Sequence, residues 1–229
     1  MKDILSSKKV FLIINIVIIA VIFILNYFYQ SNNFNYTLKC ICSSCFALLG
    51  LINLAYALVT NQAKKHFYAA MAAGCVLAFS GDVVINLSFI PGAGLFALGH
   101  VCFIIAYGFL RKFRSLDFLL IAVIAVASIA IVLFCPVLEF SEPILRWVCV
   151  AYATIISAML GKSIANFIHQ QNVFYAILAA GSLLFFFSDL MLLLDWFAGL
   201  WSWTNEACMA TYYPALCLLA FSMHHKAVN

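Results

Sequence analysis

Eight apolar runs, each close to the length of a membrane-crossing helix, take up most of this chain. A helix needs about 20 mainly apolar residues to cross the hydrocarbon core of a bilayer. Polar residues or Pro and Gly separate the runs, which cover approximately residues 10–28, 39–60, 66–89, 94–110, 116–137, 144–161, 173–195 and 204–223. The sequence therefore predicts an all-α fold, a polytopic membrane bundle of eight transmembrane helices.

The composition excludes an ordinary soluble domain. Of the 229 residues, 67% are hydrophobic and 9% are charged, whereas soluble domains carry about 25% charged residues. The runs leave no room for a soluble domain between them, so we expect residues 1–229 to form a single membrane domain. The first run, 10–28, follows Lys8-Lys9 and precedes no small-residue cleavage site, which indicates a retained helix.

The basic residues orient the predicted helices. Most of the 12 Lys and Arg residues fall on one side of the bundle, which the positive-inside rule makes cytoplasmic. We therefore expect a multi-pass protein of a plasma or inner membrane, with both termini in the cytoplasm. The net charge of +4 comes from short clusters in loops, so no nucleic-acid partner is expected. The residues on the cytoplasmic side are Lys2, Lys8, Lys9, Lys64, Lys65, Arg111, Lys112, Arg114, Lys162 and Lys226.

Two aspartates lie within the apolar runs, and their surroundings are alike. Residues 67–82 align without a gap on residues 174–189, and both segments end on an aspartate, Asp82 and Asp189. An ionised side chain at membrane depth costs about 3 kcal/mol or more, so such residues are rare and usually functional. The pair is therefore the first candidate for a functional site.

The same offset links the two basic residues on the outer side, Lys39 and Arg146. This agreement predicts that residues 39–110 and 146–217 are copies, so that each half of the chain has four spans in the same orientation. An axis along the membrane normal would relate such halves and could bring both aspartates to a central cleft near the outer leaflet. The alternative is that apolar segments align by chance.

Two carboxylates in a site of low dielectric constant can divide acid and base chemistry between them. They cannot both be ionised at low cost, so one should keep its proton while the other stays charged. This is the arrangement of the paired-carboxylate hydrolases. We predict that Asp82 and Asp189 are catalytic. The alternative is that each aspartate only hydrogen-bonds a neighbouring helix.

Polar residues in the outer half of the bundle are candidates for substrate binding. Asn86 follows Asp82 by one helical turn and shares its face. Lys39 and Arg146 would suit a phosphate group, although snorkelling to lipid headgroups would also explain them. The remaining candidates are His100, Tyr152, Asp195, Glu206 and Tyr212; a structural donor role for the histidine and an aromatic belt for the tyrosines are the alternatives.

Nine cysteines are scattered through the apolar runs, where they are typical of small buried hydrophobic residues. The densest group, Cys40, Cys42 and Cys45, has no further ligand at metal-binding spacing. We therefore expect no metal site.

The chain resembles the YhhN-like family, the lysoplasmalogenases. The resemblance rests on Lys39 at the head of the second span, the Ser80-Gly81-Asp82 signature, the stretch 92–100 that ends on His100, and Phe187-Ser188-Asp189. Cys40 departs from the proline that many members carry after the lysine. The resemblance implies hydrolysis of the vinyl ether bond of lysoplasmalogens, which releases a fatty aldehyde and a glycerophospho-ethanolamine or -choline. Its partners would be this lysophospholipid and membrane lipid, and it implies no cofactor.

Two other classes of protein fit parts of the sequence. A small-molecule or lipid transporter also has repeats and intramembrane acids, although its binding helices are usually interrupted near the midplane. An intramembrane aspartyl protease also has two membrane aspartates, and Pro214-Ala215-Leu216 matches a tripeptide of that family. The sequence does not distinguish which aspartate would be the acid.

Overall fold

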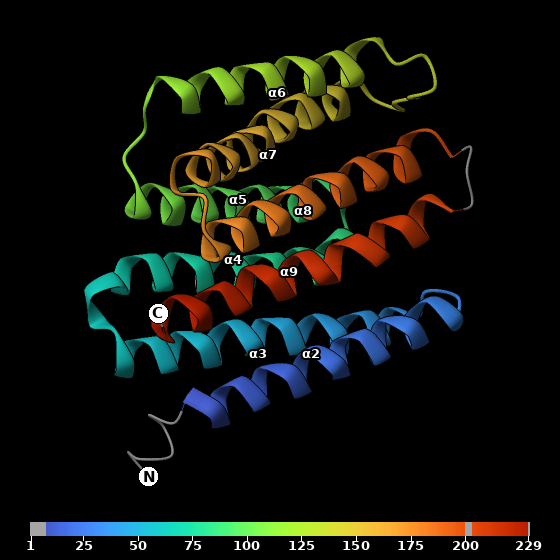
Figure 1. The fold of residues 1–229 in the computed structure, drawn as a ribbon. Helices are drawn as coiled ribbons and strands as arrows, with labels where there is room; N and C mark the ends of the chain where they lie inside the picture. Colours follow the sequence, from blue (N-terminus) through green and yellow to red (C-terminus); the bar gives the residue numbers. More distant parts are fainter. Residues whose placement is uncertain (1–7, 200–202, 229) are drawn as a thin grey trace.

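The computed structural model describes residues 8–199 and 203–228, and this part of the chain is a bundle of eight α-helices without strands (Figure 1). The predicted all-α bundle is confirmed. In chain order, the helices are α2 (Lys8–Ser31), α3 (Tyr36–Thr60), α4 (Lys65–Ile85), α5 (Phe89–Leu110), α6 (Ser115–Phe134), α7 (Pro143–Gln170), α8 (Val173–Phe197) and α9 (Thr204–Val228), with a 3₁₀ turn, η1 (Gln62–Lys64), between α3 and α4.

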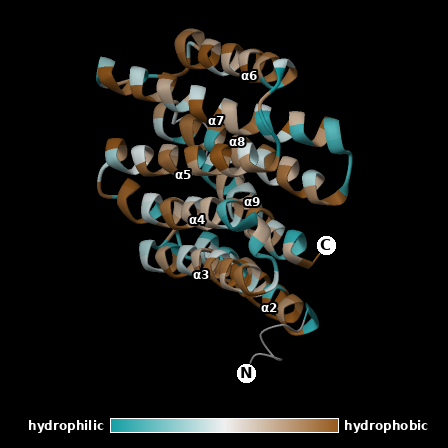
Figure 2. Cartoon of the chain, turned by 90° about the vertical axis from the view of Figure 1, so that its left-hand side faces the viewer, coloured by the Kyte–Doolittle hydropathy of each residue, from teal (hydrophilic) through white to brown (hydrophobic). Residues whose placement is uncertain are grey.

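Seven of the helices, α2 to α8, are long and apolar enough to cross a membrane. Apolar residues dominate the helices in Figure 2, and the chain is an integral membrane protein. Helix α9 is as long as its neighbours but less apolar. It packs against α2, α3, α4 and α8, so many of its polar side chains face protein rather than lipid.

The described chain begins and ends at the same end of the bundle (Figure 1). Lys8 Nζ donates a hydrogen bond of 2.9 Å to the carbonyl of Val228. We call this the terminal end, and the opposite end, where α2 joins α3 and α8 joins α9, the distal end. The basic residues of the loops lie at the terminal end, whereas Lys39 and Arg146 lie in the first turns that begin at the distal end. Lys2 lies outside the described residues. Which end faces the cytoplasm stays a prediction.

The helix contacts follow a pattern that a two-fold axis would produce. Helix α4 packs between α3 and α5, and α8 packs between α7 and α9. The cross-contacts are α3 with α9 and α5 with α7, which are the pairs that such an axis would exchange. This pattern agrees with copies at 39–110 and 146–217, and the internal repeat itself stays a prediction.

Three helix boundaries differ from the predicted spans by five residues or more, and one of them is the end of α9, at Val228 rather than near residue 223. Helix α7 continues to Gln170 rather than ending near residue 161, because the charge of Lys162 is neutralised inside the protein. Helix α5 begins at Phe89 rather than near residue 94. The tight connection before it requires Gly92, since a Cβ atom there would lie 2.4 Å from the Cα of Ile85.

A buried group of charges joins the loop between α5 and α6 to α7 at the terminal end. Asp117 accepts a hydrogen bond from Lys162 Nζ (3.0 Å) and forms an ion pair with Arg111. Arg111 Nε also donates to Asn166 Oδ1 (3.0 Å). The side chains of Asp117 and Lys162 are fully buried. Arg111 and Lys162, whose charges indicated only the topology in the sequence, also hold helices together in the structure.

Candidate active site

A polar cavity of about 220 Å³ lies toward the distal end of the bundle. Helices α3, α4, α8 and α9 contribute most of its polar wall. Six of the predicted site residues line it: Lys39, Asp82, Asn86, Asp189, Asp195 and Tyr212. The structure thus brings both predicted catalytic aspartates to one cavity.

Asp82 is almost fully enclosed by groups that stabilise a negative charge. Its Oδ2 accepts hydrogen bonds from Ser43 Oγ (2.7 Å) and from the hydroxyl of Tyr212 (2.7 Å). Lys39 Nζ lies 3.5 Å from Oδ1. Lys39 and Ser43 are one turn apart on α3, so both face α4. Two hydroxyl donors and an ammonium group are the surroundings of an ionised carboxylate.

Asp189 has different partners. Its Oδ2 accepts a hydrogen bond of 2.6 Å from the hydroxyl of Tyr152 and lies 3.1 Å from Nε2 of the buried His100. Nε2 also lies 2.8 Å from the Tyr152 hydroxyl. Within the described part of the chain, Oδ1 has no hydrogen-bond partner. The two aspartates therefore sit at corresponding points of α4 and α8 but differ in their electrostatic environment.

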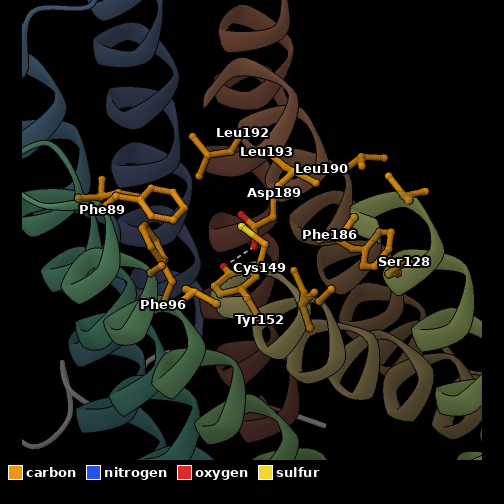
Figure 3. Close-up of a pocket in the computed structure, with 17 residues that line it drawn as sticks. Phe89, Phe96, Ser128, Cys149, Tyr152, Phe186, Asp189, Leu190, Leu192 and Leu193 are labelled. Atoms are coloured by element: carbon orange, nitrogen blue, oxygen red, sulfur yellow. Dashed lines mark hydrogen bonds between the residues drawn. The ribbon is translucent and has the colours of Figure 1, made fainter. Parts of the chain in front are cut away.

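An apolar pocket of about 80 Å³ adjoins the polar cavity. Figure 3 shows Asp189 and Tyr152 in its wall, with Phe89 and Phe96 to one side and Phe186 to the other. The polar cavity and the apolar pocket share four residues in their walls: Ile85, Phe96, Asp189 and Leu192. Asp82 lines only the polar cavity. Asp189 therefore stands where a polar space meets an apolar one.

Asn86 and the two tyrosines have defined contacts in this site. Asn86 Nδ2 donates to the main-chain carbonyl of Asp82 (2.9 Å), so its amide does not hold the carboxylate, although it lines the cavity. Tyr152 and Tyr212 each donate to one aspartate and are not exposed to lipid as an aromatic belt would be.

The structure does not bring Arg146 and Glu206 into the site, which corrects their prediction as substrate-binding residues. Both side chains are exposed and neither lines the cavity. The Arg146 guanidinium lies 5.2 Å from the centre of the Phe140 ring, because the loop before α7 folds back over the first turn. Only one of the two outer cations, Lys39, therefore reaches the aspartates.

Several residues of the site were not predicted from the sequence. Ser43 contacts Asp82, and its Oγ lies 3.2 Å from the hydroxyl of Tyr213. The spacing of four residues between Lys39 and Ser43 could have pointed to it. Cys208 lines the cavity from α9, which no local pattern indicates. Among the described residues, no group of three or more His, Cys, Asp or Glu side chains is placed to hold a metal ion.

The fold and this site define an integral membrane protein with two aspartates in one internal cavity. The sequence profile of the YhhN family matches residues 34–223, from the end of the α2–α3 connection into the last part of α9. The chain belongs to the YhhN family, as its motifs predicted. It matches no curated protein and no solved structure.

Proposed function

We propose that this protein hydrolyses the vinyl ether bond of lysoplasmalogens. The observation that carries the proposal is the position of Asp189 between the polar cavity and the apolar pocket. In a lysoplasmalogen, the vinyl ether joins an apolar chain to a polar glycerophospho-headgroup. With the chain in the pocket and the headgroup in the cavity, the bond to be cleaved lies beside Asp189. Membership of the YhhN family supports the same class of reaction.

Asp189 is the proton donor in this proposal. Hydrolysis of a vinyl ether begins when the alkene carbon on the chain side takes a proton, which leaves an oxocarbenium ion on the side of the glycerol oxygen. Asp189 faces the chain side, and its Oδ1 is not occupied by another described residue. Tyr152 and His100 hold Oδ2, so they fix the direction of Oδ1.

Asp82 is the charged partner. Its carboxylate stabilises the oxocarbenium ion. Water then adds to the carbon that is bonded to the ether oxygen, and Asp82 takes the proton that the water releases. The hemiacetal then breaks its bond to the glycerol oxygen, which takes the proton back from Asp82. The hemiacetal hydroxyl gives its proton to Asp189 as the aldehyde forms. Both aspartates return to their starting states.

The proposal is tested by following aldehyde release from matched lipids. Purified protein should form a fatty aldehyde from a 1-alkenyl lysophospholipid and leave the 1-alkyl analogue intact, because a saturated ether has no alkene carbon to protonate. A 1-acyl lysophospholipid is the second control. Release of fatty acid from it at a comparable rate, or the absence of aldehyde from the alkenyl lipid, would contradict vinyl ether chemistry.

Lys39→Gln should lower kcat by about 10- to 100-fold, since it removes the cation that keeps Asp82 charged and leaves less of the carboxylate form to act as the general base. Arg146→Gln is the matched control, because it removes an outer cation that does not reach the cavity. We expect its kinetics to be unchanged. Steady-state assays of both variants distinguish this role of Lys39 from phosphate binding alone, which would raise KM and leave kcat intact. Equal effects of the two substitutions would contradict the assignment.

A further inference from the structure

The wall of the polar cavity carries more negative than positive side chains. Among the described residues that line it, the basic and acidic side chains are one cation, Lys39, and three carboxylates, Asp82, Asp189 and Asp195. Lys39 balances Asp82 at 3.5 Å. Asp189 carries a proton in the reaction proposed above. Asp195 therefore remains as a carboxylate that no cationic side chain of the described chain neutralises.

A hydrogen bond to one carboxylate oxygen of Asp195 holds the side chain in place, and the other oxygen is available to a ligand. It lies near the end of α8, and its Oδ1 accepts a hydrogen bond of 3.0 Å from the hydroxyl of Thr204 at the start of α9. Within the described ranges, its Oδ2 has no hydrogen-bond partner. A fixed, half-buried carboxylate in the wall of a cavity favours a cationic ligand.

Aromatic rings line the same cavity as Asp195. Tyr29 and Phe34 line it, with ring centroids 5.3 Å apart at an interplanar angle of 81°. Trp196, the neighbour of Asp195 in the chain, lines it as well. Rings of this kind attract ammonium groups through their negative faces. The carboxylate and the rings thus recognise the same chemistry.

The rest of the cavity supplies donors for an anion. Asn86 and Asn205 line it with Lys39. An amide group and an ammonium group both donate hydrogen bonds to phosphate oxygens. The cavity wall therefore combines hydrogen-bond donors with a carboxylate and aromatic rings, a combination that is complementary to a zwitterion rather than to a simple anion.

We infer that Asp195 binds the ammonium group of the lipid headgroup, with Trp196 and Tyr29 beside it. The inference rests on the proposed function, because it places the headgroup in the cavity and the chain in the apolar pocket. It makes Asp195 a specificity-determining residue. Lipids with an ethanolamine or choline headgroup should bind better than a lipid that ends in a phosphate monoester.

The test measures binding of 1-alkyl lysophospholipids, which this chemistry does not cleave, to the purified full chain. Asp195→Asn should weaken binding of the ethanolamine and choline lipids by about tenfold, the factor expected when one charge-assisted contact is lost. Binding of 1-alkyl lysophosphatidic acid, which lacks the ammonium, should not weaken. Glu206→Gln is the matched control, because it removes an exposed acid of the same end that does not line the cavity.

Equal weakening for all three lipids, or no change for any, would overturn the inference. A loss confined to the ethanolamine lipid would support it and identify hydrogen bonding by the primary ammonium as the recognised feature. A loss with both zwitterionic lipids would identify the charge. Because these lipids are not hydrolysed, the binding test is independent of the proposed reaction. If Asp195 determined the preference for zwitterionic lipids in a protein that releases no aldehyde, the proposed reaction would be wrong and the headgroup site would still be supported.

Discussion

Asp82→Asn and Asp189→Asn should each lower kcat for vinyl ether hydrolysis by about 10²- to 10⁴-fold, the range that general acid–base catalysis contributes. Asparagine keeps the size of the side chain and removes the proton transfer. The two substitutions act on one reaction, so the double variant should be little slower than the slower single variant. Aldehyde release from a 1-alkenyl lysophospholipid measures all three.

Two further measurements keep this prediction separate from a loss of fold. Each variant should still bind the uncleavable 1-alkyl lipid, and each should elute as the wild type does in size-exclusion chromatography. Proton transfer to carbon is usually slow, so the wild type should be slower in deuterium oxide. If either asparagine variant kept near-normal activity, that aspartate would have only a role in helix packing.

Asp117→Ala should destabilise the folded protein by about 3–5 kcal/mol, the cost of leaving a buried ion pair without one partner. The substitution leaves Arg111 and the fully buried Lys162 without the carboxylate that neutralises both of them. It also removes the carboxylate that accepts the backbone N–H of Arg114 (2.6 Å) at the start of α6. Thermal unfolding in detergent, or the half-life at a fixed temperature, measures the loss.

A second substitution tests whether charge or packing causes this loss. Removing the buried lysine as well, in Asp117→Leu with Lys162→Met, should recover part of the stability, because apolar side chains of similar volume can replace a buried pair. Lys112→Ala, which changes an exposed cation of the same loop, should have little effect. A stable Asp117→Ala protein would show that the charge cluster does not hold these helices together.

The architecture was largely predictable from sequence because the membrane imposes it. Apolar runs of one bilayer thickness become helices, since lipid offers no other partner to backbone polar groups. The predicted helix boundary was wrong where a charge is buried. Lys162 indicated the end of a span, but its pairing with Asp117 lets α7 continue. Sequence patterns do not show which distant residue will neutralise a charge.

The site was predictable in part for a related reason. Asp82 and Asp189 stand out because a carboxylate in an apolar run is costly, and Lys39 because it breaks the charge asymmetry. Arg146 carries the same signal as Lys39 but turns toward Phe140, which depends on how a loop folds. The packing of α9 against α3 and α4 decides which hydroxyl groups reach Asp82, and such contacts have no local signature.

The position of α9 bears on how the protein is made. Helix α9 follows α2 to α8 in the described part of the chain and is less apolar than they are. Its Tyr212 and Cys208 form part of the cavity wall. During synthesis, the seven earlier helices can enter the bilayer on their own hydropathy, whereas α9 gains from entering a groove that they have already formed. The cavity should therefore stay incomplete, and the nascent chain unable to carry out the proposed reaction, until α9 has inserted.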